Sequence, residues 1–143
     1  MALTHLLDTS VLSQPIKDHP MPVVMDRWSA QGDTSVCTSA ICVAELLQGL
    51  EIRQSEKYWR RYRELLENRY AALPFDQTVA AVFGQTSAAL RSSGQPRSIV
   101  DLLIASTAKR HGLIVATLNS KDFCGIPGLQ VEDWSLDPSQ PRE

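Results

Sequence analysis

The chain has 143 residues, of which 43% are hydrophobic and 21% charged, and its formal net charge is −2. This size and composition are typical of one folded domain with a hydrophobic core, and the slight acidic excess excludes a protein that binds nucleic acid by positive charge alone. No apolar run is long enough to span a membrane, no signal peptide is recognisable, and the three cysteines form no CxxC pair. We therefore expect a cytoplasmic protein with reduced thiols.

The first part of the chain predicts two strands with helical segments between them. Residues 3–7 form a short apolar run that is typical of a buried strand, and a turn or short helix after it is expected to end at Pro15. Apolar side chains at helical spacing predict a helix over residues 22–31 that stops at Gly32. A second strand is expected at residues 36–37.

Two helices of different character follow. The hydroxyl of Thr38 or Ser39 can cap a helix over residues 40–50, which has Gly49 near its end. Residues 53–69 are the most charged stretch of the chain. Aromatic and apolar residues recur there at helical spacing, which predicts an amphipathic helix.

The second half repeats the alternation. Strands are expected at residues 73–75, 113–118 and 129–132, the last at an edge of the sheet, and helices over residues 78–91 and 99–110. Short apolar strands separated by helices predict an α/β fold, in which a short, mostly parallel sheet is flanked by helices. In such sheets ligands bind beyond the carboxyl ends of the strands.

The sequence contains no internal repeat and no stretch that reads as a linker. We expect a single domain over residues 1–136. Residues 137–143 are rich in proline and polar residues and are expected to form a flexible C-terminal tail.

Four acidic residues lie in apolar segments that can bring them to the edge where ligands bind. They are Asp8, Glu45, Asp101 and Asp122. A carboxylate in an apolar segment is costly unless it is paired, hydrogen-bonded or bound to a cation, and only scattered basic residues lie beside these four. Oxygen ligands without paired Cys or His residues favour Mg²⁺ or Mn²⁺ over zinc. Such an ion can support in-line phosphoryl displacement.

Asp101 is the strongest single signal. Ile99, Val100 and Leu102 are among the apolar residues around it, so the sequence predicts a helix with almost no polar face at this point. A bound cation is the simplest way to keep such a carboxylate ionised.

The same residues also have purely structural interpretations, which the sequence leaves open. Asp8 can cap a short helix, Glu45 can be a solvated side chain, and Asp101 can close a capping box. Asn119 and Asp122 lie in a loop, where Asn and Asp commonly form turns.

The charged helix expected over residues 53–69 allows two interpretations as well. Arg60, Arg61 and Arg63 can belong to a solvated face with ion pairs along the helix. Alternatively, they can steer RNA phosphates toward the acidic edge or contact a protein partner.

Several motifs follow one another in an order that is fairly specific. They are Leu7-Asp8-Thr9-Ser10, residues 39–46, residues 101–105, Thr117-Leu118-Asn119 with Asp122-Phe123, and residues 126–129 with Glu132-Asp133-Trp134. In this order the chain resembles the PIN-domain ribonucleases, and in particular the VapC-type toxins of bacterial toxin–antitoxin pairs. The resemblance implies a three-layer α/β sandwich.

The resemblance also implies an endoribonuclease that depends on Mg²⁺ or Mn²⁺, with Asp8, Glu45 and Asp101 as its acidic residues. Many relatives carry an acid where this chain has Asn119, and Asp122 lies a little further on. Both are therefore candidates for a catalytic role.

The resemblance further implies supporting roles for two threonine hydroxyls, an antitoxin as partner and a homodimer. Thr9 and Thr117 can support the carboxylates by hydrogen bonds. A VapB-type antitoxin would wrap the toxin and block the acidic site, and the toxin would form a homodimer.

Two other functions remain as alternatives. A catalytically silent PIN module that serves as a protein partner in a repressor complex is one, and Asn119 is the feature that favours it. A small phosphatase is the other, but Ser10 stands where a second aspartate would be expected.

Overall fold

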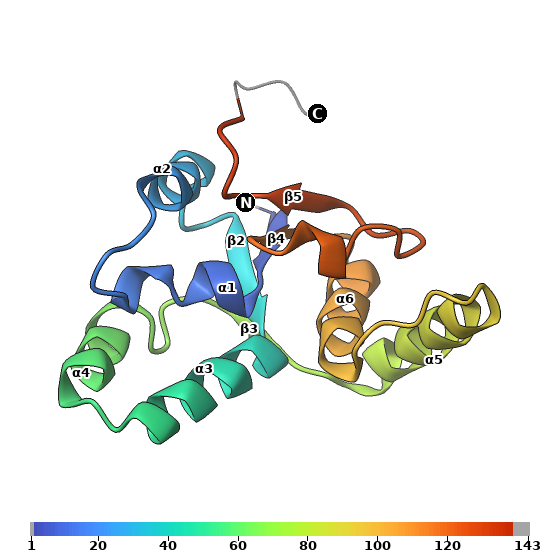
Figure 1. Ribbon diagram of the computed structural model, residues 1–143, viewed down its shortest axis with the longest axis horizontal. Helices are drawn as coiled ribbons and strands as arrows, with labels where there is room; N and C mark the ends of the chain where they lie inside the picture. Colours follow the sequence, from blue (N-terminus) through green and yellow to red (C-terminus); the bar gives the residue numbers. More distant parts are fainter. Residues whose placement is uncertain (1, 139–143) are drawn as a thin grey trace.

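The computed structural model describes residues 2–138, which form a five-stranded, all-parallel sheet flanked by six helices (Figure 1). The strands are β1 (His5–Leu7), β2 (Val36–Ser39), β3 (Ala72–Leu73), β4 (Ile114–Thr117) and β5 (Val131–Asp133). The helices are α1 (Thr9–Leu12), α2 (Pro22–Gln31), α3 (Ala40–Arg53), α4 (Glu56–Leu65), α5 (Gln77–Ser92) and α6 (Ile99–His111). Two short 3₁₀ turns are η1 (Gln14–Ile16) and η2 (Ser120–Asp122). The predicted α/β fold is confirmed.

The strand order is β3-β2-β1-β4-β5, so the direction of the chain across the sheet reverses between β1 and β4. Because crossovers between parallel strands are right-handed, this reversal puts the helices of the two halves on opposite faces. Figure 1 shows α1 to α4 on one side of the sheet and α5 and α6 on the other. The carboxyl ends of β1 and β4 therefore border the crevice where sheets of this kind bind ligands.

The central strands are buried along nearly their whole length, which explains why their sequences do not alternate between apolar and exposed polar residues. Leu6 and Leu7 of β1 and Val115 and Ala116 of β4 are fully buried. Helices on both faces cover these side chains, so each strand contributes to two hydrophobic layers.

Most helix starts follow from the capping residues of the sequence. The side chains of Ser39, Asp76 and Ser98 accept hydrogen bonds from the backbone N–H groups that open α3, α5 and α6. Gly112 ends α6 in the left-handed conformation. The bounds predicted for α2, residues 22–31, agree with the structure.

The predicted end of α3 and the predicted extent of α4 were wrong. The helix predicted to end at Leu50 continues to Arg53, because the buried Leu50 packs this end of α3 onto the core. Gln54 then adopts the left-handed conformation and closes the helix. The continuous helix predicted over residues 53–69 is therefore shorter, and α4 begins after Ser55.

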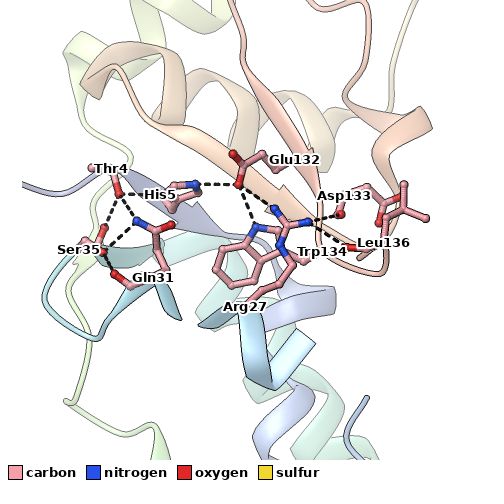
Figure 2. A network of polar contacts seen from close by, with 9 residues as sticks. All are labelled: Thr4, His5, Arg27, Gln31, Ser35, Glu132, Asp133, Trp134 and Leu136. Carbon is pink, nitrogen blue, oxygen red and sulfur yellow. Dashed lines mark hydrogen bonds and ion pairs between the residues drawn. The ribbon is translucent and has the colours of Figure 1, made fainter. Parts of the chain in front are cut away.

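A polar network fastens the C-terminal strand to the rest of the domain (Figure 2). Glu132 accepts hydrogen bonds from His5 Nε2 at 2.9 Å, Trp134 Nε1 at 3.1 Å and Arg27 Nη2 at 3.4 Å. Burial opposes ionisation of Glu132, but the bonds from Trp134 and His5 outweigh it and hold the pKa below its ordinary value. Arg27 also donates to the carbonyls of Asp133 and Leu136. The network thus joins α2, β1 and β5.

Residues 139–143 of the predicted flexible tail lie outside the described residues, so the division at residue 136 stays a prediction. Within residues 2–138, no helix has the length and apolar character that a membrane span requires.

Replacing Arg27 by alanine should lower the free energy of unfolding by about 2–3 kcal/mol, because hydrogen bonds of charged groups contribute roughly 1.5–3 kcal/mol. Urea unfolding measures this loss. Arg91→Ala is a matched control, since Arg91 is exposed on the last turn of α5. Equal stability of the two variants would contradict the fastening role of Arg27.

Candidate active site

Asp8 lies directly after β1, and three donors from two segments, α1 and the end of β4, hold its carboxylate. Ser10 Oγ donates to Oδ1 at 2.5 Å, and the Val11 N–H donates to the same oxygen at 3.3 Å. Thr117 Oγ1, from the end of β4, donates to Oδ2 at 2.7 Å. Asp8 therefore caps α1, as its structural interpretation predicted, and also joins the two strands at the reversal point.

No positive side chain compensates the charge of Asp8 within residues 2–138. The residue is only 6% exposed. Burial raises the pKa of Asp8 above its ordinary value, and the hydrogen bonds from Ser10 and Thr117 counteract part of this rise. An ionised Asp8 is therefore a native-state cost that a bound cation can offset.

Ser10 also belongs to the site, although the sequence predicted no such role for it. Its Oγ donates to Asp8 and accepts the N–H of Leu118 at 3.0 Å. Thr117 Oγ1 similarly accepts the N–H of Asn119 at 2.9 Å. Both hydroxyls thus link the chain after β1 to the chain after β4. The available signal was a hydroxyl two residues after an aspartate, a common spacing for local hydrogen bonds.

Glu45 lies in the second turn of α3 and is half-buried. Its Oε1 accepts a hydrogen bond of 2.6 Å from Thr9 Oγ1, at the start of α1. Thr9 and Thr117 each donate to one of the carboxylates proposed for them. Glu45 and Asp8 are thereby connected through adjacent residues of one segment.

Asp101 is less enclosed than its sequence predicted. Ile99 is 68% exposed and Val100 is 38% exposed, because both lie in the first turn of α6 before the helix packs on the sheet. Asp101 completes a capping interaction, with its N–H donating to Ser98 Oγ at 3.2 Å and its Oδ2 accepting from that hydroxyl at 2.7 Å. The apolar surroundings expected for Asp101 were therefore wrong at this end of the helix.

The loop after β4 carries the remaining candidates. Asn119 is exposed and precedes η2, and Asp122 is half-buried at its end. Among residues 2–138, no three Asp, Glu, His or Cys side chains are grouped so that they could hold a metal ion as they stand. The structure brings Asp8 to Thr117 and Glu45 to Thr9, but it does not converge the carboxylates on one point.

Two buried cysteines have thiols whose ionisation is disfavoured by burial. Burial raises the pKa of Cys37 to about 12 and also raises the pKa of Cys42, which follows Ser39 in the first turn of α3. Neither thiol is therefore a nucleophile at neutral pH.

The basic residues of α4 divide into two groups. Arg61 donates to the Ile16 carbonyl at 3.0 Å and to Asp18 at 2.9 Å, and Lys57 forms a further ion pair with Asp18 at 2.9 Å. Hydrogen bonds from Tyr58 and Lys57 hold the pKa of Asp18 well below its ordinary value. Arg61 is therefore engaged within the fold.

Two other basic residues of α4 face solvent. Arg60 and Arg63 are exposed. Arg63 also borders an open pocket with Trp59 and Glu56.

Comparison with known proteins gives the family. The model of the PIN domain matches residues 5–129. The chain belongs to the PIN-domain family.

It is 34% identical over 134 residues to the tRNA(fMet)-specific endonuclease VapC of Shigella flexneri, covering 93% of this chain and 99% of that protein. It is 35% identical over 135 residues to toxin FitB of Neisseria gonorrhoeae, covering 90% and 97%. Within the PIN family it is thus a VapC-type ribonuclease toxin of a toxin–antitoxin system.

Solved structures agree with this assignment. The crystal structure of DNA-bound VapBC from Salmonella typhimurium has a chain that matches with a TM-score of 0.79 and 33% identity, covering 92% of this chain and 98% of that one. FitAcB from Neisseria gonorrhoeae matches with a TM-score of 0.84 and 31% identity, covering 93% and 100%. The PIN fold therefore extends over nearly the whole chain.

Asp8→Asn should raise the melting temperature at neutral pH in EDTA. Because the pKa of Asp8 is raised in the native state, the native state binds more protons than the unfolded state at pH values between the ordinary and the raised pKa. The stability of the native state therefore falls as the pH rises through this range. Asparagine removes this cost, and the advantage should shrink as pH falls to about 4, where unfolded aspartate also protonates. We expect a gain of a few degrees, given roughly 3–4 °C per kcal/mol at this chain length.

Asp76→Asn provides a control of opposite sign. Hydrogen bonds from Thr78 and the Val79 N–H lower the pKa of this exposed cap, so its ionised form stabilises the native state above that pKa. Asp76→Asn should therefore melt lower at neutral pH. If Asp8→Asn also melts lower at every pH, burial does not make the Asp8 charge unfavourable.

Proposed function

We propose that this ribonuclease toxin is a divalent-metal-dependent endoribonuclease that hydrolyses RNA at the sheet edge between β1 and β4. The observation that carries the proposal is Asp8, a buried carboxylate at the reversal point of the sheet whose charge has no partner cation within residues 2–138. An acid with a perturbed pKa at the carboxyl ends of parallel strands, where the strand order reverses, is a favoured candidate for catalysis.

The donor chemistry fits Mg²⁺ or Mn²⁺. Asp8, Glu45 and Asp101 would hold the ion, because hard cations prefer carboxylate oxygens. When bound, the ion supplies charge stabilisation for the phosphodiester and makes a water molecule more acidic. Since the three carboxylates do not converge as they stand, the mutual repulsion of their charges is consistent with a site that closes on ion binding.

The chain's own hydroxyls and loop residues have supporting roles in this proposal. Thr117 and Ser10 orient Asp8, and Thr9 orients Glu45. Asn119 and Asp122 would contact the attacking water or the RNA from the loop after β4. Asn119 can do so through its amide without adding negative charge.

The substrate and partners are proposed from the relatives. The Shigella flexneri protein is named for tRNA(fMet), so initiator tRNA is the first RNA to test. Relatives were crystallised as VapBC and FitAB complexes, which supports a VapB-type antitoxin as partner. We also infer a homodimer and action in the cytoplasm, where RNA substrate and antitoxin occur together.

A catalytically silent PIN module is the second candidate, favoured by Asn119 and by carboxylates that do not converge. RNA cleavage across a titration of Mg²⁺ and Mn²⁺ separates the two functions. Cleavage that requires the ion supports the nuclease, and the absence of cleavage at every ion concentration supports the silent module.

Asp101→Asn should abolish cleavage without unfolding the protein, because the variant retains the capping geometry with Ser98 but loses the charge. The loss should exceed the ~10–100-fold that is typical for groups outside the ligand set. RNA cleavage in Mg²⁺ and thermal melting with Mn²⁺ or EDTA provide the measurements. A folded variant with wild-type activity would exclude Asp101 from the metal site.

Neutralising Arg60 and Arg63 together to glutamine should weaken RNA binding while kcat stays near the wild-type value. Each lost phosphate contact should reduce the salt dependence of RNA affinity by about 0.7 in slope for a single strand. Arg61 is left intact, because it pairs with Asp18. Affinities for RNA and for antitoxin should be measured across one salt series. If only antitoxin binding weakens, this face of α4 is a protein contact, and if neither changes it is a solvated face.

A further inference from the structure

Arg97 connects two segments of the proposed site. It lies immediately before Ser98, the cap of α6, and its Nη1 donates to the Gln95 carbonyl at 2.8 Å. Its Nη2 donates to the Cys124 carbonyl at 2.7 Å. Cys124 follows Asp122 by two positions in the loop after β4. The side chain therefore spans from the start of α6 to the loop that carries Asp122.

Among the residues that the structure describes, the guanidinium of Arg97 donates hydrogen bonds to backbone carbonyls only. Within residues 2–138, no Asp or Glu side chain forms an ion pair with Arg97. Its Nε is buried and has no hydrogen-bond partner in that part of the chain. Leaving a buried donor unpaired is unfavourable, so surface charge alone does not explain this position. The planar, forked donors of arginine do explain it, because they reach two carbonyls at fixed angles.

Gly125 fits closely against the same guanidinium. It has a φ of +87°, a conformation that other residues rarely adopt. A Cβ at this position would lie 3.2 Å from Arg97 Nη2, which is closer than ordinary contact. The position of the Arg97 guanidinium thus favours a residue without a side chain at position 125 of the loop.

We propose that Arg97 is a positioning residue for RNA cleavage, which holds the loop bearing Asn119 and Asp122 against the start of α6, where Asp101 lies. This rests on the function proposed above, in which those residues form the cleavage site. The residues between α5 and α6 are mostly exposed, so little of that connection is buried against the domain. The hydrogen bond from Arg97 to the Cys124 carbonyl links this connection directly to the loop after β4.

Direct contact of Arg97 with an RNA phosphate is the competing role. The structure favours positioning, because both Nη atoms already donate to carbonyls and Nε is buried. The two roles predict different effects of lysine. Lysine restores a point charge for a phosphate, but it does not reproduce the fork between two carbonyls.

The test uses three variants of the full chain and one control. Arg97→Gln and Arg97→Lys change the donor, and Gly125→Ala disturbs the same contact while keeping the arginine. Arg91→Gln removes an exposed positive charge elsewhere. For each protein we would measure the melting temperature, Mn²⁺ affinity without RNA by electron paramagnetic resonance, and kcat and KM for RNA over a salt series.

Positioning predicts that Arg97→Gln, Arg97→Lys and Gly125→Ala all weaken Mn²⁺ binding or lower kcat by roughly 10-fold, as is typical of groups that orient metal ligands. KM for RNA and its salt slope should stay within about twofold of the wild type and of Arg91→Gln, because no phosphate contact is lost. Gly125→Ala keeps the test valid if Arg97→Gln fails to fold.

Other outcomes would overturn the proposal. A higher KM and a smaller salt slope in Arg97→Gln, restored by lysine and absent in Gly125→Ala, would assign Arg97 to phosphate binding. Wild-type Mn²⁺ affinity and kcat in all three variants would assign it no role. If Asp101→Asn is inactive in the same assays, this failure concerns Arg97 alone; if Asp101→Asn is active, the proposed cleavage site itself fails.

Discussion

The hydrogen bond from Thr117 Oγ1 to Asp8 joins the ends of β1 and β4, the two strands between which the strand order reverses. The parallel register of β1 and β4 brings these residues together, with the Asp8 N–H donating to the Ala116 carbonyl at 3.0 Å. Ser10 adds a second bridge between the same two segments. The position of the buried carboxylate, and hence of the whole acidic edge, depends on this pairing.

The same arrangement has an energetic consequence for function. Hydroxyl groups hold Asp8 in place without supplying positive charge, so its ionisation costs native-state stability. In the function proposed above, Asp8 is oriented before a cation binds, and binding of the cation would stabilise the native state. The C-terminal network differs, because Glu132 is compensated by Arg27 and by two further donors. The buried Asp8 thus has no compensating positive side chain within residues 2–138, whereas the half-buried Glu132 has one and fastens the fold.

Much of the fold was predictable because its signals are local. Ser39, Asp76 and Ser98 cap helices within three residues of themselves, and the burial of β1 and of most of β4 is visible as largely apolar runs. The candidate residues Asp8, Glu45 and Asp101 were chosen for the same reason, as charges inside apolar segments. The end of α3 was predicted too early, at Leu50, because packing of Leu50 on the core extends the helix to Arg53.

By itself, the sequence determined the alternation of strands and helices, the caps and the positions of the acidic residues, since each depends on neighbours along the chain. Only the tertiary structure decided which side chains meet. Arg97 reaches Cys124, and Arg61 pairs with Asp18 rather than with a helical neighbour. The exposure of Ile99 was likewise decided by how α6 lies on the sheet. Contacts between distant segments depend on strand order and helix packing, which no local pattern encodes.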